Sequence, residues 1–293
     1  MNKLIDVVFY FIWRILNPIS FIKFIFSHNK KISRKESYSG QREDLSILAK
    51  KINTELFKSS EFLRKVEFAK VSTDNFGFTF DCYDYLSYDL KHEIYEFASS
   101  NQFLNMKVDS FLGINSTLNS ISIYANVPRE SDVEIGSKMW HRDGNTYLAA
   151  DFMFAVSDIN DNNGPFYWVN PNDFGDAKFY KSKSDSGWEY NGRFSDNDLF
   201  NSGLKKDSVQ KFIGLPGSYI LLNTGESFHK GGFCKSEVRI LGRFVYSSLG
   251  YSIGNVNRYN SICLNNGVIF LILLKLYSFH EKIYRNVNKL LTK

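Results

Sequence analysis

Apolar residues recur at helical spacing in two early segments of the chain. The first set is Leu45, Leu48, Ile52 and Leu56, and the second is Leu86, Leu90, Ile94 and Phe97. Steps of three and four residues place each set on one face of a helix. We therefore expect one helix over residues 43–58 and another through the second set, packed on the outside of a sheet.

A period of two residues predicts strands elsewhere. Phe76, Phe78 and Phe80 alternate with polar or small residues, as in a half-buried strand. From about residue 104 onward the chain reads as strand after strand, over 121–127, 146–157, 165–169, 217–222 and 237–247. Turn signals at 161–165 and 215–217 punctuate this run. Such strands predict a mainly β fold, a double-stranded β-helix (jelly roll, cupin-like) core with flanking α-helices.

Segment 172–210 interrupts the strands with polar and aromatic residues and a short helix capped by Ser195 or Asp196. Long loops inside compact domains are usually lids or functional insertions. Polar and basic residues at 29–43 predict a linker. The expected organisation is an N-terminal segment (1–28), this linker, a jelly-roll domain (44–255) and a C-terminal helical segment (256–293).

Both ends of the chain are apolar. The run at 4–26 is broken by Asp6, Arg14, Pro18 and Lys23, so it lacks the roughly 20 uninterrupted apolar residues of a spanning helix. Asp6 and the absence of a small-x-small pattern also argue against a signal peptide. Segment 268–277 is followed by basic residues. Two alternatives stay open: both helical ends lie on an anionic membrane surface, or they pack against each other or the β core.

Composition narrows the classes of function. Aromatic residues make up 16% of the chain, which favours strands and a well-filled core. Cys82, Cys234 and Cys263 are widely spaced, which argues against a disulfide framework or a structural zinc site and favours a reducing compartment. The net charge is only +5 and no long basic block is interleaved with aromatics, so we do not expect a nucleic-acid partner.

Three residues have the chemistry of metal ligands. His141 and Asp143 stand two positions apart in Trp140-His141-Arg142-Asp143-Gly144, so on an extended strand they point to one side. His229 supplies a third ligand downstream. Two imidazoles and one carboxylate form the facial triad that holds ferrous iron and leaves the opposite face open. We take His141, Asp143 and His229 as the catalytic metal ligands.

This constellation resembles the iron- and 2-oxoglutarate-dependent dioxygenases, especially the phytanoyl-CoA dioxygenase-like family. The ligands, followed by Arg239, come in family order, and segments 140–143, 152–170 and 217–246 are similar to the family's strand-and-turn pattern. The resemblance covers roughly residues 75–250. It implies Fe(II), with 2-oxoglutarate and dioxygen as co-substrates. In halogenating relatives a small residue stands at the position of Asp143, so the carboxylate implies hydroxylation or a related oxidation.

The distal carboxylate of 2-oxoglutarate requires a buried cation, and the planar fork of arginine suits it. Arg239 lies ten positions after His229, close to the family offset, and is our preferred residue. Arg243 shares the strand face and is the alternative; whichever does not bind is expected to be a surface or substrate-side charge. Tyr124 or Ser122 is a further candidate for a hydrogen bond to 2-oxoglutarate.

The expected function is hydroxylation of a small-molecule or lipid- or glycan-linked substrate, with decarboxylation of 2-oxoglutarate to succinate. Two alternatives remain: a non-catalytic jelly-roll ligand-binding module, and a metal-dependent hydrolase or isomerase on a cupin-like barrel. We expect a cytoplasmic protein, which would be peripheral on the inner face of the membrane if the apolar ends bind lipid.

Overall fold

The computed structural model describes residues 37–72, 78–112, 116–129, 134–143, 149–174 and 193–247. The predicted terminal segments, 1–28 and 256–293, lie outside these residues. Within the described part of the chain, no helix is long and apolar enough to cross a lipid bilayer.

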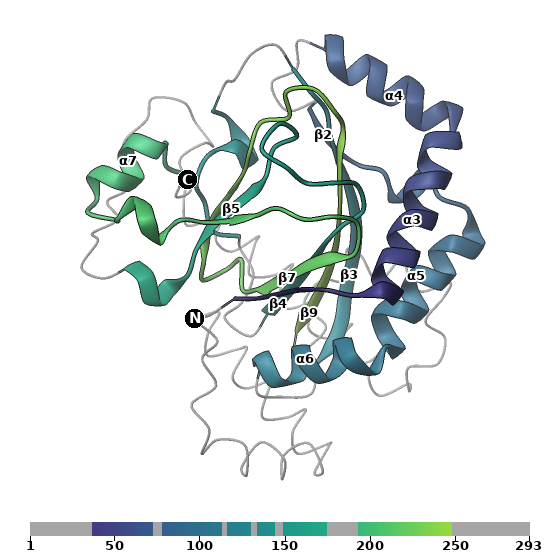
Figure 1. Ribbon diagram of the computed structural model, residues 1–293, viewed down its shortest axis with the longest axis horizontal. Helices are drawn as coiled ribbons and strands as arrows, with labels where there is room; N and C mark the ends of the chain where they lie inside the picture. The colour runs from purple at the N-terminus through teal and green to yellow at the C-terminus, as the bar shows by residue number, and fades with distance from the viewer. Residues whose placement is uncertain are drawn as a thin grey trace, which may run out of the picture.

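Two antiparallel sheets form the framework (Figure 1). The larger sheet has six strands in the order β1-β7-β4-β9-β3-β2, and the smaller has three in the order β6-β5-β8. The strands are β1 (Tyr38–Gln41), β2 (Thr79–Asp81), β3 (Thr117–Asn126), β4 (Ala149–Ala155), β5 (Phe166–Val169), β6 (Gln210–Phe212), β7 (Ser218–Leu222), β8 (Phe228–Gly231) and β9 (Arg239–Ser247). This arrangement is consistent with the predicted jelly roll.

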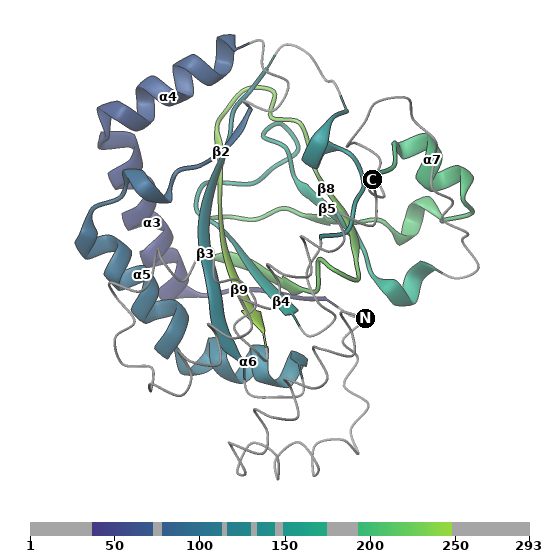
Figure 2. The same ribbon diagram turned by 180° about the vertical axis from the view of Figure 1, so that it is seen from behind.

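Four helices cover the outer face of the larger sheet, as Figures 1 and 2 show from opposite sides. They are α3 (Glu43–Lys58), α4 (Ser60–Val71), α5 (Tyr88–Ser100) and α6 (Gln102–Leu112). Helix α7 (Asp196–Asn201) lies on the opposite side, beside the smaller sheet. Short 3₁₀ turns are η1 (Tyr83–Tyr85), η2 (Gly136–Lys138), η3 (Pro171–Phe174) and η5 (Lys206–Ser208).

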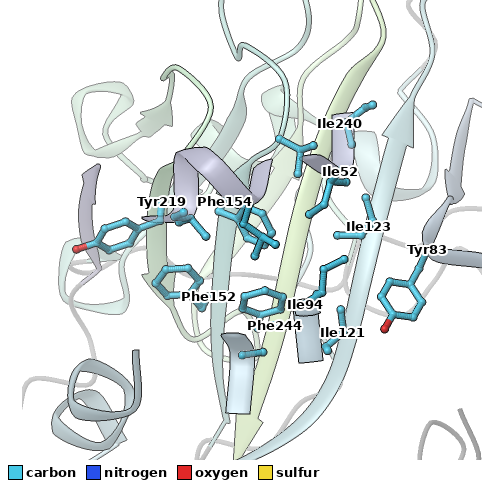
Figure 3. Close-up of a cluster of buried hydrophobic side chains, with 14 of the residues drawn as sticks. Ile52, Tyr83, Ile94, Ile121, Ile123, Phe152, Phe154, Tyr219, Ile240 and Phe244 are labelled. Atoms are coloured by element: carbon cyan, nitrogen blue, oxygen red, sulfur yellow. The ribbon is translucent and has the colours of Figure 1, made fainter. Parts of the chain in front are cut away.

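Alternation along the strands divides the apolar residues into two layers. Phe152, Phe154 and Phe244 point toward the helices and pack together in the outer core (Figure 3). The rings of Phe152 and Phe244 are stacked with centroids 6.1 Å apart, and those of Phe154 and Phe244 are tilted with centroids 5.0 Å apart. Their strand neighbours point inward. The inner cluster joins the two sheets and consists of Met153, Ala155, Ile159, Phe166, Trp168, Phe212, Ile220, Leu222 and Leu241. The sheets therefore pack face to face, and inward-facing positions are where a site can form.

Several predicted elements are confirmed. The helix predicted over residues 43–58 is α3, and all four apolar residues that predicted it are buried. The second is α5, which begins after Ser87, whose side chain accepts a hydrogen bond from Leu90 N. The helix within the insertion is α7, and its N-cap is Ser195 in a capping box with Asp198. The strands predicted after residue 120 overlap β3, β4, β5, β7 and β9.

Other expectations were wrong. Residues 102–112, where we expected strands to begin, form α6, because Leu104, Val108 and Phe111 recur at helical spacing and are buried. Helix α4 was not predicted. Tyr38–Gln41, assigned to the linker, form β1 and pair with β7. All four β1 residues are exposed, so their place in the sheet depends on backbone pairing that no apolar pattern reveals.

We expect two phenylalanine-to-alanine substitutions to lower the free energy of unfolding by different amounts. Phe244 is fully buried, so Phe244→Ala should lower the free energy of unfolding by about 3–5 kcal/mol through lost burial and a residual cavity. Phe68 on α4 is 61% exposed, so Phe68→Ala should change it by no more than about 0.5 kcal/mol. Urea unfolding followed by circular dichroism measures both. Equal losses would contradict the assignment of Phe244 to the core.

Candidate metal centre

The two histidines face each other through the backbone. His141 N donates to His229 O at 3.0 Å, and His229 N donates to His141 O at 2.9 Å. On its other side His229 pairs with Trp168 of β5. These contacts on both flanks fix His229 in register, and the two imidazole centroids lie 4.3 Å apart.

Each imidazole is oriented by a carbonyl two residues before it. His141 Nδ1 lies 2.8 Å from Met139 O, and His229 Nδ1 lies 3.2 Å from Ser227 O. A carbonyl can only accept, so Nδ1 carries the proton in both rings and Nε2 keeps its lone pair. Both Nε2 atoms face Asp143 Oδ1, at 3.7 Å from His141 and 3.6 Å from His229. The three ligand atoms lie within 4.8 Å of one another, which confirms that the predicted residues converge.

Charge states at the triad suit a divalent cation. Burial, together with the neighbouring His229, lowers the pKa of His141 to about 3, so this imidazole is neutral at physiological pH. Burial alone would raise the pKa of Asp143, but the neighbouring His229 and the charge of Arg243 outweigh it and hold the pKa well below its usual range. Metal binding requires a neutral imidazole and an ionised carboxylate. The donor set fits iron in the 2-His-1-carboxylate arrangement.

The Arg243 guanidinium is hydrogen-bonded to two carboxylates. Its Nη2 donates to Asp143 Oδ2 at 2.6 Å, and its Nε donates to Asp151 Oδ1 at 2.7 Å. Asp151 is fully buried and accepts from Thr224 Oγ1 at 2.6 Å and Thr224 N at 3.2 Å. Burial lowers the pKa of Arg243, but the charges of Asp151 and Asp143 raise it to a net increase. Arg243 is therefore neither a surface charge nor a free cation.

Arg239 is different. Arg239 is only 3% exposed, and within the described part of the chain its buried Nε and Nη1 atoms have no hydrogen-bond partner. Burial lowers its pKa. Buried polar groups of this kind are costly unless an anion or another acceptor satisfies them. A carboxylate, which matches the guanidinium fork, fits this position.

Tyr124 and Ser122, the weaker candidates, lie on the inner face of β3. In the pairing with β9, Tyr124 is opposite Leu241 and Ser122 is opposite Arg243. Both side chains are partly buried. Both therefore lie on the face of the larger sheet that carries Arg239 and Arg243.

Sequence reasoning missed three residues at this centre. Asp151 could have been found, since it is the one acid inside the otherwise apolar run Ala149–Ala155. Thr224 carries no such signal. Lys138 of η2 is buried and donates to Gly232 O, close to the Arg239 guanidinium, although its sequence context resembles a surface turn.

Other tryptophan, histidine and cysteine residues lie outside the triad. Trp140 lies in a buried cluster with Phe194 and Phe228, and Trp168 lies in the inner cluster. His92 is exposed on α5. Cys82 and Cys234 are buried free thiols, whereas Cys263 lies outside the described residues.

No family model and no curated protein matches the sequence. Solved structures similar to this chain are non-heme iron or 2-oxoglutarate-dependent enzymes. EctD from S. alaskensis, solved with 2-oxoglutarate and 5-hydroxyectoine, is 15% identical over 74% of this chain and 73% of that chain, with a TM-score of 0.47. The non-heme monooxygenase ThoJ in its apo form is 14% identical over 74% and 76%, with a TM-score of 0.46. The epimerase SnoN, in complex with Fe³⁺, alpha ketoglutarate and nogalamycin RO, is 13% identical over 70% and 83%, with a TM-score of 0.39. At these values the reaction has to be inferred from the site's own residues.

Burial of a neutral His141 predicts acid sensitivity of the metal-free protein. The unfolded chain takes up this proton near pH 6.5 and the folded protein only at about 3, so between these values the unfolded state binds more protons. Stability is then fully present above pH 6.5 and falls as the pH decreases. Relative to His141→Gln, the wild type should lose up to about 1.4 kcal/mol more per pH unit.

Urea titrations with a chelator present, from about pH 6.5 to about pH 4.5, measure this difference. His92→Gln, which removes an exposed histidine, is the matched control and should keep the wild-type slope. Identical slopes in wild type and His141→Gln would contradict the prediction.

Proposed function

We propose that this protein is an Fe(II)- and 2-oxoglutarate-dependent oxygenase that hydroxylates a small-molecule or lipid- or glycan-linked substrate. The observation that carries the proposal is the position of the Arg239 guanidinium beside the metal triad, with Nε and Nη1 lacking a hydrogen-bond partner among the described residues. A metal triad alone would serve a hydrolase or isomerase equally well. A buried cation without an internal partner beside it indicates an anionic co-substrate.

Gly231 defines the relation between the cation and the metal. It lies two residues after His229 on β8, so a side chain there would point to the same face as the imidazole. A Cβ atom added at Gly231 would lie 3.4 Å from Arg239 Nη2. The guanidinium therefore fills the space beside His229. Positions 229 and 231 are separated by one two-residue repeat of the strand, which is about 7 Å along β8. A short dicarboxylate could reach the metal with one end and Arg239 with the other.

The competing arginine supports the same division of roles. Arg243 already binds the carboxylates of Asp143 and Asp151, whereas Arg239 has buried donors without acceptors. In the proposal His141, Asp143 and His229 bind Fe(II), Arg239 binds the distal carboxylate of 2-oxoglutarate, and Tyr124 lies on the wall between the sheets. When bound, the iron with 2-oxoglutarate and dioxygen supplies an oxidant strong enough to remove a hydrogen atom from carbon.

The insertion is the proposed source of substrate specificity. Its described part is held against the outward face of the metal strands, where Asp196 Oδ1 accepts from Trp140 Nε1 at 2.6 Å and from Lys230 Nζ at 2.5 Å. Trp140 and Lys230 are the chain neighbours of His141 and His229. A substrate bound by the insertion would thus lie near the ligand strands. A lipid-linked substrate and peripheral membrane association rest on the apolar ends and stay proposals.

Anaerobic titration with Fe(II) and 2-oxoglutarate tests the cofactor assignment. The wild type should develop the metal-to-ligand charge-transfer band, because the keto acid chelates the triad-bound iron. Asp143→Ala should lose the band with the metal. Arg239→Ala should bind iron but require roughly 10-fold or more 2-oxoglutarate, since it loses charge-assisted hydrogen bonds.

The control is His92→Ala, which removes an exposed histidine on α5 and should leave the titration unchanged. Absence of a band in the wild type would contradict the proposal and favour a binding module. Turnover of a substrate without oxygen would instead favour the hydrolase or isomerase. With the band established, succinate release provides the readout for a substrate screen.

A further inference from the structure

We propose that Arg243, held by Asp151 and Thr224, is a positioning residue that fixes the metal-binding carboxylate of Asp143 so that Oδ1 alone faces the metal. This inference rests on the proposed iron site and deepens it. It assigns to Arg243 a role other than binding 2-oxoglutarate.

Four residues form a closed ring of hydrogen bonds. Asp143 N donates to Thr224 O at 3.0 Å, and Thr224 Oγ1 donates to Asp151 Oδ2 at 2.6 Å. Arg243 closes the ring by bonding Asp151 Oδ1 and Asp143 Oδ2. Its Nη2 also lies 3.3 Å from Thr224 Oγ1. Each member therefore has partners on two sides, and Asp143 is held through both its backbone and its side chain.

The ring attaches Asp143 to the rigid part of the fold. Asp151 belongs to β4 and Arg243 to β9, two central strands of the larger sheet that pair directly. Thr224 follows the end of β7, where Leu222 pairs with Asp151. Asp143 itself belongs to no strand, so its carboxylate takes its orientation from these neighbours.

The two carboxylate oxygens of Asp143 have separate tasks in this arrangement. Oδ1 faces Nε2 of both histidines, whereas Oδ2 accepts a short charge-assisted bond from Arg243. Holding Oδ2 on the guanidinium favours coordination through Oδ1 alone. Residues that orient a metal ligand by hydrogen bonding commonly raise metal affinity by roughly 10–100-fold.

Arg243 needs Asp151 for this task. A guanidinium has a planar fork that can bridge two carboxylates, whereas an ammonium is a point charge. With Asp151 fully buried and bonded to Thr224, the fork has one fixed end and presents the other to Asp143. The network also explains the acid in the middle of the apolar strand β4.

The test compares metal and co-substrate affinities in matched arginine variants. The double variant Arg243→Gln/Asp151→Asn removes both buried charges together, which avoids leaving Asp151 unpaired. It should bind Fe(II) or Co(II) roughly 10–100-fold more weakly than the wild type, with the 2-oxoglutarate affinity at saturating metal unchanged. Arg239→Gln should show the reverse pattern. Arg243→Lys keeps the charge without the fork and should fall between the double variant and the wild type in metal affinity.

The ligand-field absorption spectrum of bound Co(II) reports the coordination of the metal. It would stay unchanged if Arg243 contributed only to the stability of the fold. Loss of a fixed carboxylate should alter this spectrum in both Arg243 variants. Arg129→Gln is the matched control, because this arginine donates to Ala69 O of α4 and lies outside the ring. Circular dichroism of the metal-free proteins verifies folding, and if the double variant fails to fold, Arg243→Lys carries the comparison.

Three outcomes would overturn the inference. Wild-type metal affinity and an unchanged Co(II) spectrum in the folded Arg243 variants would remove the positioning role while leaving the proposed function intact. Loss of 2-oxoglutarate affinity with normal metal affinity would make Arg243 a co-substrate ligand. A wild-type protein that binds no metal would defeat the proposed function and this inference together.

Discussion

The backbone pairing between His141 and His229 is the constraint on which the metal centre depends. The two ligands come from distant parts of the chain, and their reciprocal hydrogen bonds set both imidazoles on one side. Strand β8 is held between this segment and β5. Because side chains alternate with a period of two, a slip of one residue in β8 would turn His229 outward. The same slip would move Gly231 away from the Arg239 guanidinium and turn the side chain of Lys230 inward.

Strand β9 joins the site to the core through the same alternation. Ile240, Phe244 and Tyr246 pack toward the helices, whereas Arg239 and Arg243 point between the sheets. Burying two cations on one strand is costly, and each requires an anion. For Arg243 the chain supplies two carboxylates. For Arg239 two guanidinium nitrogens stay unsatisfied. This difference in hydrogen-bond partners, rather than the spacing from His229, is the basis for the different proposed roles of the two arginines.

The sequence identified the three side chains that converge because a period-two pattern and residue chemistry are both local. His141 and Asp143 needed only two positions on extended backbone, and His229 followed from the family resemblance. The choice between Arg239 and Arg243 could not be made with the same certainty, since residues four apart share a strand face. What separates them is Asp151, which lies far away in the sequence. Helix α6 was missed although its apolar spacing was present, and β1 was missed because backbone pairing leaves no side-chain signal.

Alternation also couples the insertion to the metal. On the segment that carries His141 and on β8, the inward residues are the two histidines of the candidate triad, while their neighbours Trp140 and Lys230 bond to Asp196 at the start of α7. Phe194 pairs with Trp140 through backbone hydrogen bonds of 2.8 and 2.9 Å. A displacement of α7 would therefore pull on the backbone beside both imidazoles, whereas Asp143 would resist it through its separate attachment to β4 and β9.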